Sequence, residues 1–316
     1  VNEQPHVPSR LRSMGLFTFD GISSTTMAIE SIKGSLKLVP STPRGGPGHQ
    51  HTPSKRKMRD FRLAHIQLND HVAADEVQGV RELGQENQLR SLISEVNSRF
   101  LSMSQDIDVT EEHLMMGALK GQVIDGDGST VLWDLFSEFG VSALSDVDFT
   151  LGTSTTNIKA LCNQVIRGMI DELGDTPLGM VHAMCGDDFY DGLSTHAEVR
   201  DSYHRQQESA FLREGAGSYE TFKYGNSTWE NYRGSVGGTP FVATDECRFF
   251  VRGVPGLFVG RYGPADYNET VNTRGLPRYA KLIPDQNDKG AALEEQTNLI
   301  TLCTRPRTLR KGLTSN

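Results

Sequence analysis

His182 and Cys185 are the residues in this chain whose types and spacing come nearest to direct chemistry. A cysteine beside a histidine can act as a nucleophile with its general base. The surrounding segment LGMVHAMC is typical of a buried strand, however, and a thiol held there packs against its neighbours. We therefore interpret both side chains as packing residues.

Two further patterns contain residue types that bind metal ions. Asp125 and Asp127 resemble the start of a calcium loop, but the twelfth position of that loop would be Phe136, where a bidentate glutamate is required. A turn is the better interpretation. His49 and His51 alternate in a Gly-Pro loop without a third ligand, so solvated side chains are favoured. We predict no metal site.

Motifs of the common enzyme classes are absent from the sequence. It contains no G-x-S-x-G, no H-E-x-x-H, no Walker loop and no G-x-G-x-x-G between a strand and a helix. The cysteines lie far apart without C-x-x-C spacing, which indicates neither a zinc site nor a disulfide framework and fits a reducing compartment; they are Cys162, Cys185, Cys247 and Cys303. We predict no cofactor and no catalytic residue. An intracellular enzyme that uses residues 40–56 as an active-site lid stays the alternative.

Composition and charge limit the function classes further. The formal charge of −8 argues against a DNA-coating protein, because phosphate neutralisation needs clustered lysines and arginines. No stretch approaches 18 consecutive apolar residues, which predicts a soluble chain without a helical membrane span. With 316 residues, of which 32 are glycine, we expect two domains or one elongated fold with many turns and strands.

The element that organises the chain is the run from Gln85 to Met116, which contains neither glycine nor proline. Its apolar residues recur at three- and four-residue steps and predict one face of a long helix: Leu89, Leu92, Ile93, Val96, Phe100, Met103 and Ile107. Such a helix would be about 45 Å long. Its other side is charged, so we expect a sheet on one side and solvent or a partner on the other.

A basic extension precedes this helix. The segment TTMAIESIKGSLKLVP predicts a hairpin that turns at Lys33-Gly34 and pairs Ile29 with Leu38. Residues 40–56 form a long loop of proline, glycine and serine. The strand-like segment RKMRDFRLAHIQL follows and places Arg59, Phe61 and Leu63 on one face.

Charge complementarity links the extension to the helix. Residues 44–62 carry six basic side chains against one acidic, whereas residues 75–120 carry nine acidic against four basic. An extended loop favours contact between copies of the chain, although two solvated charge runs stay an alternative. The predicted intersubunit contacts are Arg44, Lys55, Arg56, Lys57, Arg59, Phe61, Leu63, Glu86, Glu95, Asp106 and Asp108. A nucleic-acid-binding loop is opposed by the missing aromatic residues between these cations.

The second half of the chain predicts an α/β lobe followed by strands. Ser154 or Thr155 is expected to cap a helix with a broad apolar face, and Gly174 to end it. Short helices follow the strand LGMVHAMC. The remainder is rich in strand patterns divided by glycine and proline: FVATDECRFFVRG, LFVGRYG, RYAKLIP, ALEEQTNLITLCT and RTLRKGL.

Several long motifs, in order, resemble the phage major capsid protein E family, the lambda type. They are DEVQGVRELG, HLMMGALKGQVIDGDGSTVLWDLFSEFG, STTNIKALCNQVIRGMIDELG, AFLREGAG, ENYRGSVGGTPFVATDE, VPGLFVGRYGPADYNETVNTRGLPRYAK and CTRPRTLRKG. The resemblance implies an α+β fold of the HK97 type. It maps an N-terminal arm onto 1–24, a hairpin and E-loop onto 25–70, a P-domain onto 71–150 with return strands 263–316, and an A-domain onto 151–262.

The same resemblance implies a structural function without catalytic residues. Copies would assemble in the host cytoplasm into hexamers and pentamers of an icosahedral head in the virion. That head would enclose double-stranded DNA without sequence-specific binding and without a membrane. The implied partners are other copies of the chain, a scaffolding protein and a portal, and the need for a decoration protein is left open. An acidic wall suits this function, since a wall that bound phosphates would hinder DNA movement.

Overall fold

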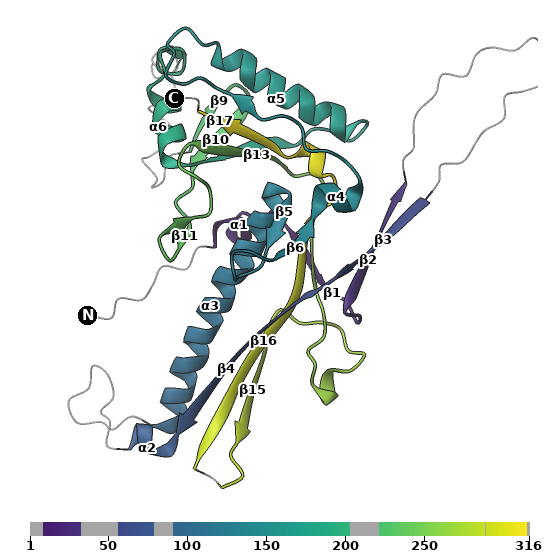
Figure 1. Cartoon of the computed structure of the whole chain (residues 1–316), viewed down its shortest axis with the longest axis vertical. Helices are drawn as coiled ribbons and strands as arrows, with labels where there is room; N and C mark the ends of the chain where they lie inside the picture. The colour runs from purple at the N-terminus through teal and green to yellow at the C-terminus, as the bar shows by residue number, and fades with distance from the viewer. Residues whose placement is uncertain (1–8, 33–55, 79–90, 203–220, 288, 315–316) are drawn as a thin grey trace, which may run out of the picture.

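The computed structural model describes residues 9–32, 56–78, 91–202, 221–287 and 289–314. Figure 1 shows an elongated molecule in which a long helix, α3 (Leu92–Lys120), runs beside a five-stranded sheet. A six-stranded sheet lies at one end together with α5 (Ile158–Leu173) and α6 (Asp187–Thr195). The chain combines helices with sheets whose strand pairs are mostly antiparallel, which is the α+β class that the sequence predicts.

The long helix differs from its prediction at both ends. It begins after Ser91, whose side-chain oxygen accepts a hydrogen bond from the Ser94 N–H at 3.1 Å. It continues to Lys120 and ends at Gly121, where φ is 87°. Residues 79–90, which include the predicted start, lie outside the described residues. The helix signal in the sequence was therefore sound, but the last residue was placed too early.

The apolar face of α3 is only partly covered by the sheet. Val96 and Met103 are buried and pack with Val72 and Leu293 from the sheet. In contrast, Ile93 is 73% exposed, although the sequence pattern places it on the same face. The apolar positions at the N-terminal end of the helix, Leu92 and Ile93, therefore face solvent in the single chain, whereas Ile107 at the other end of the pattern is fully buried.

The five-stranded sheet is built around the longest strand, β16 (Gly290–Cys303). Its neighbours are β14 (Phe258–Tyr262), β15 (Tyr279–Pro284) and β4 (Ala64–Ala73), all antiparallel to it. The strand β1 (Thr18–Gly21) extends the sheet parallel to β14. β16 also contacts α3, and the Thr301 hydroxyl donates to the Leu114 carbonyl at 3.1 Å.

The six-stranded sheet has its own aromatic core. Its order is β7 (Val147–Asp148), β17 (Arg310–Leu313), β13 (Glu246–Arg252), β8 (Met180–Cys185), β10 (Ser227–Asn231) and β9 (Thr221–Tyr224). Trp229 is fully buried, and the rings of Phe149, Phe189 and Phe249 lie within 6.2 Å of it, centroid to centroid. The predicted strands of the second half are all present.

The cap of α5 corrects the sequence prediction. Asn157, rather than Ser154 or Thr155, caps the helix, because its side-chain oxygen accepts from the Ala160 N–H at 2.9 Å. All of these residue types cap well, so composition alone does not separate them. The helix ends at Gly174, as predicted.

The turn predicted at Lys33-Gly34 and the predicted partner Leu38 lie outside the described residues. The strand β2 (Thr26–Ile32) pairs with β3 (Arg56–Arg62), a pairing that the sequence did not predict, and Ile29 lies opposite Arg59. A local turn signal cannot exclude a longer connection between strands of suitable pattern. Residues 33–55, including the predicted loop, lie outside the described residues. Figure 1 shows the β2–β3 ribbon standing out from the side of the long sheet.

Short elements connect these layers. The turn predicted at Asp125 and Asp127 is confirmed: it joins the antiparallel strands β5 (Gln122–Ile124) and β6 (Val131–Asp134), and the Asp127 carboxylate accepts from the Ser129 and Thr130 N–H groups at 2.8 Å. That carboxylate therefore organises the turn. The remaining elements are α1 (Arg10–Ser13), α2 (Ala74–Val77), α4 (Leu135–Phe139), β11 (Ser235–Val236), β12 (Thr239–Pro240), η1 (Asn268–Thr270) and η2 (Pro306–Thr308).

Each of the two large sheets contains strands from more than one of the domains expected from the sequence. β1, expected in the arm, and β4, expected in the extension, both belong to the five-stranded sheet, as does β14 from the expected A-domain. β7 and β17, expected in the P-domain, belong to the six-stranded sheet. The reason is that strand patterns specify a strand and its buried face but not a partner that is distant in sequence.

Gly117 in α3 is predicted to be required for close packing. A Cβ atom there would lie 2.8 Å from the Val123 Cα atom. Gly117→Ala should therefore lower the free energy of unfolding by about 1–3 kcal/mol, although alanine favours a helix. The matched control is Gly168→Ala in α5, whose Cβ would meet only the end of the long Arg310 side chain and no backbone atom. Urea unfolding of both variants checks this, and equal stabilities would contradict it.

Candidate assembly interface

Three consecutive residues of α1 connect α3 to the six-stranded sheet. The Arg10 guanidinium donates to Glu230 on β10 at 2.9 Å. The Leu11 N–H donates to the Glu112 carboxylate on α3 at 2.8 Å, and the Leu11 side chain is fully buried. Arg12 donates to Glu111, one residue earlier on α3, at 2.9 Å. The segment that the sequence assigns to a draped arm is thus an internal clamp, which we call the α1 clamp (residues 10–12).

A second arginine joins α3 to the long sheet. Arg278, just before β15, donates to Asp108 at 2.6 Å and to Glu111 at 3.4 Å. Burial raises the pKa of Glu111, and the charges of Arg12 and Arg278 oppose that rise without cancelling it. Asp108, predicted as an intersubunit contact, is therefore engaged by arginines of its own chain.

The buried pair His182 and Glu230 has a structural geometry. The Nε2 atom of His182 lies 2.9 Å from the Glu230 carboxylate, whose other partner is Arg10. Burial alone would raise the pKa of Glu230, but the hydrogen bonds from His182 and Arg10 outweigh it and hold the pKa at about 2. Cys185 is fully buried, and burial raises the pKa of Cys162 to about 12. The packing interpretation of the thiols is confirmed.

The base of the β2–β3 ribbon is anchored inside the same chain. Phe61 is 2% exposed, and its ring lies 5.8 Å from that of Phe139 on α4. The Arg59 guanidinium lies over the Phe139 ring at 5.4 Å, and Leu63 is buried too. The prediction that Phe61 and Leu63 contact a neighbour is wrong, because the sequence did not reveal that α4 covers this face.

The other predicted contact residues fall into three groups. Glu95 pairs with Arg99 at 2.7 Å, so its charge is used within α3, whereas Asp106 is exposed. Arg56 and Lys57 lie on β3, opposite Ile32 and Ser31 respectively. Arg44, Lys55 and Glu86 lie outside the described residues. An exposed apolar residue on the ribbon that the prediction missed is Met58, which is 64% exposed and adjoins the basic run.

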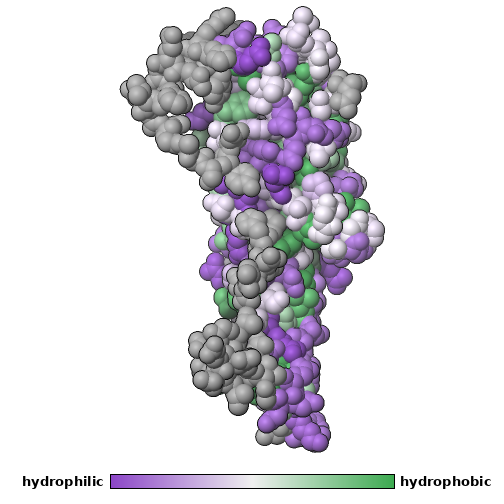
Figure 2. All heavy atoms as spheres, turned by 90° about the vertical axis from the view of Figure 1, so that its left-hand side faces the viewer, coloured by the Kyte–Doolittle hydropathy of each residue, from purple (hydrophilic) through white to green (hydrophobic). Residues whose placement is uncertain are grey.

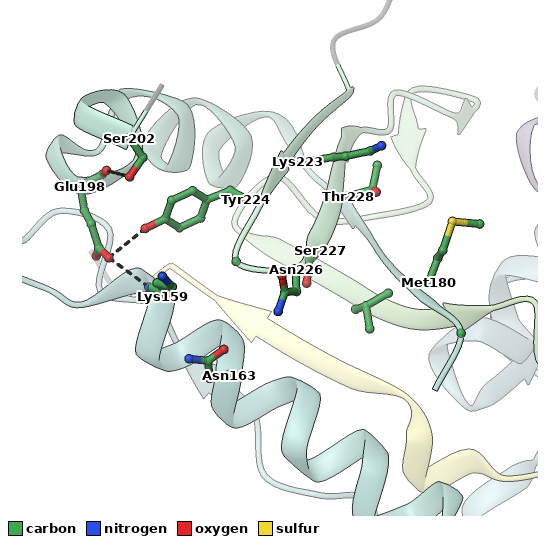
Figure 3. Close-up of a pocket in the computed structure, with 13 residues that line it drawn as sticks. Lys159, Asn163, Met180, Glu198, Ser202, Lys223, Tyr224, Asn226, Ser227 and Thr228 are labelled. Carbon is green, nitrogen blue, oxygen red and sulfur yellow. Dashed lines mark hydrogen bonds between the residues drawn. The ribbon is translucent and has the colours of Figure 1, made fainter. Parts of the chain in front are cut away.

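A hollow of about 820 Å³ lies between the start of α5 and the β9–β10 hairpin. Figure 3 shows Glu198 pointing toward Tyr224 and toward the first residues of α5. Its carboxylate accepts from the Tyr224 hydroxyl at 2.8 Å and from the Ile158 N–H at 2.6 Å. This carboxylate therefore helps to cap a helix, which accounts for its place in the wall.

Comparison with known proteins decides the family. The family model described as phage major capsid protein E matches residues 1–314. This chain belongs to the phage major capsid protein E family. The major capsid protein of Pseudomonas phage KPP10 is 26% identical over 328 residues, which cover 98% of this chain and 93% of the relative.

Solved capsid structures place the phage major capsid protein E chain in the HK97-like fold. A chain from the capsid of Myoviridae phage XM1 has a TM-score of 0.59 and 11% identity, with 100% of this chain and 95% of that chain covered. A chain from the mature capsid of bacteriophage PhiM1 has a TM-score of 0.58 and 14% identity, with 100% and 90% covered. At these identities the likeness shows the fold alone, which confirms the predicted fold class.

The surface of this capsid-family chain is largely hydrophilic on the face that carries α3. Figure 2 shows narrow hydrophobic areas between hydrophilic ones, among the residues that the structure describes. Ile93 and Leu101 on α3 are two of the exposed apolar side chains of the chain. Among the described helices, none is both long and apolar enough to cross a membrane.

Proposed function

We propose that this chain is a phage major capsid protein whose copies build an icosahedral head as hexamers and pentamers. The observation that carries the proposal is the family match across residues 1–314. The elongated HK97-like fold supports it, because a flat subunit with long edges can tile a surface. As a member of this family, the chain is a structural component of the virion capsid.

We further propose that the β2–β3 ribbon clasps a neighbouring subunit. Its support is the exposed Met58 beside a run of basic residues, and the exposed Ile93 and Leu101 on the acidic helix α3. Burying one such side chain contributes roughly 1.5–3 kcal/mol, whereas an exposed ion pair contributes about 0.2–1 kcal/mol. Apolar packing at Met58 would therefore supply affinity, and the charges would set register and encounter rate.

The remaining partners are proposed from the family. The shell would form with a scaffolding protein and a portal, and it would enclose double-stranded DNA without sequence-specific contacts. The formal charge of −8 supports a capsid wall that does not bind DNA phosphates.

We assign the long sheet with α3 to the P-domain and the six-stranded sheet to the A-domain. A non-enzymatic function is supported by the structural use of Glu198, His182 and Glu230.

Particle formation tests the proposed function directly. Expressed with its phage partners, the chain should form closed shells in electron micrographs, and expressed alone it should form oligomers or aberrant particles. Analytical ultracentrifugation of the purified chain gives the control measurement. A monomer at every concentration, without particles under any scaffold condition, would overturn the proposal.

A further inference from the structure

Carboxylates outnumber cations around the middle of α3. In the described part of the chain, four carboxylates gather there and two guanidinium groups face them; the acids are Asp108, Glu111, Glu112 and Glu295, and the cations are Arg12 and Arg278. Arg10 pairs with a fifth carboxylate, Glu230, which also contacts His182. The tyrosine hydroxyls of Tyr232 and Tyr262 complete the charged and titratable surroundings. Two acids are therefore left without a matching charge.

Glu112 makes no ion pair with the described residues, although the charge of Arg10 acts on it from a distance. It is fully buried, and its Oε1 atom accepts from the Leu11 N–H at 2.8 Å and from the Tyr232 hydroxyl at 3.2 Å. Its Oε2 atom is buried without a hydrogen-bond partner. A buried carboxylate oxygen without a donor strongly disfavours the ionised form, whereas a protonated carboxyl needs no counter-charge.

We propose that Glu112 is a proton-linked latch for the α1 clamp. While residues 10–12 lie on α3, the Glu112 carboxyl holds a proton taken from solvent on Oε2. When the clamp leaves, water reaches Glu112, and the carboxyl releases that proton and ionises. Docking of the clamp and uptake of one proton are then a single coupled step.

The sign of this coupling follows from the docked state. Burial raises the pKa of Glu112, and the Leu11 N–H, the Tyr232 hydroxyl and the backbone N–H groups of Arg12 and Arg10 reduce that rise without cancelling it. Docking is therefore strengthened as the pH falls through this raised value and weakened as the pH rises through it. Glu230 works in the opposite direction, because its pKa is about 2 and its pair with Arg10 is lost only as the pH falls from about 4.5 toward that value. The clamp is therefore tightest at mildly acidic pH, below the raised pKa of Glu112 and above about pH 4.5, where Glu230 is still ionised.

The latch controls the contact between two parts of the subunit. The α1 clamp touches α3 through Leu11 and Arg12 and touches the six-stranded sheet through Arg10. Its release would remove all three connections at once, while the strand pairs of both sheets stay formed. These contacts lie within one chain, so the inference stands apart from the proposed function.

Hydrogen exchange of the full chain tests the latch. The measured quantity is the exchange of the peptide that contains the Leu11 amide, corrected for the intrinsic effect of pH. In the wild type, corrected exchange should slow as the pH falls from 8 to 5, by up to about tenfold per pH unit over the part of this range that lies below the raised pKa of Glu112. Glu112→Gln is neutral at every pH, so its exchange should be slow at both values.

The control for this experiment is an exposed carboxylate with an ion pair of its own. Glu269 pairs with Lys281 on β15 at 3.0 Å, and Glu269→Gln should keep the wild-type pH dependence. The latch is refuted if Glu112→Gln keeps that dependence as well. It is also refuted if the Leu11 amide of the wild type exchanges more slowly as the pH rises. This second outcome is measured on the wild type alone, so it does not depend on whether a variant folds.

Discussion

Phe61→Asp is expected to destabilise the subunit so strongly that little folded protein is recovered. Removal of a buried phenylalanine ring costs about 3–5 kcal/mol, and a buried carboxylate without a partner adds a desolvation cost. Phe61 lies against Phe139, and the next residue, Arg62, accepts a hydrogen bond from the Trp133 ring N–H at 3.1 Å. The substitution would therefore detach the ribbon from α4 and β6 together. Urea unfolding followed by circular dichroism gives the size of the loss.

The matched control for this variant lies on the same strand. Met58→Asp introduces the same charge at a side chain that is 64% exposed, so its free energy of unfolding should change by less than about 0.5 kcal/mol. A similar loss in both variants would show that the strand, rather than the Phe61 pocket, sets the stability. Wild-type stability of Phe61→Asp would contradict the packing directly.

Met58→Asp is expected to give a folded subunit that fails to form shells. The proposed clasp buries Met58 against a neighbour, and an aspartate at that position would carry an unpaired charge into the contact. Sedimentation and electron microscopy of the expressed variant, with its scaffold, measure the yield of particles. The yield should fall at least tenfold, which corresponds to about 1.4 kcal/mol per contact.

A second exposed methionine separates a specific contact from a general effect of charge. Met180 on β8 is 65% exposed, so Met180→Asp makes the same chemical change at similar exposure in the six-stranded sheet. Its particles should form in normal yield. If Met58→Asp forms normal shells, the β2–β3 ribbon does not contribute to the interface through Met58. If both variants fail to form shells, the effect comes from the added charge and not from a specific contact at Met58.

The sequence predicted which segments form helices and strands better than it predicted which strands pair with one another. The periodicity of α3 and the strand patterns around β13 and β16 are local properties, and the structure has these elements where the patterns lie. The pairing of β2 with β3 and of β4 with β16 joins segments that no local pattern relates. Phe61 was assigned to an interface for the same reason, since the covering helix α4 lies far along the chain.

The α1 clamp shows a different limit of sequence reasoning. Glu111 and Glu112 appear in the sequence as part of a charged, solvated helix face, yet both are buried. A polar residue is assigned to solvent unless its partner is known, and the partners here come from residues 11, 12 and 278. The sequence did contain one signal of this burial. Glu111 and Glu112 are adjacent acids in the second half of a helix that is otherwise rich in apolar residues there.

The long sequence distance between β4 and β16 determines when the long sheet can form during translation. β4 pairs with it from Ala73 opposite Gly290 to Ala64 opposite Leu299, and β14 also pairs with it. At about 5–20 residues per second, a ribosome needs on the order of ten seconds or more between the synthesis of β4 and that of its partner. The long sheet therefore closes only after β16 has been synthesised, because β4, β14 and β15 all pair with it. Until then the edge of β4 that will pair with β16 is unpaired, and unpaired strand edges on nearby nascent chains can associate.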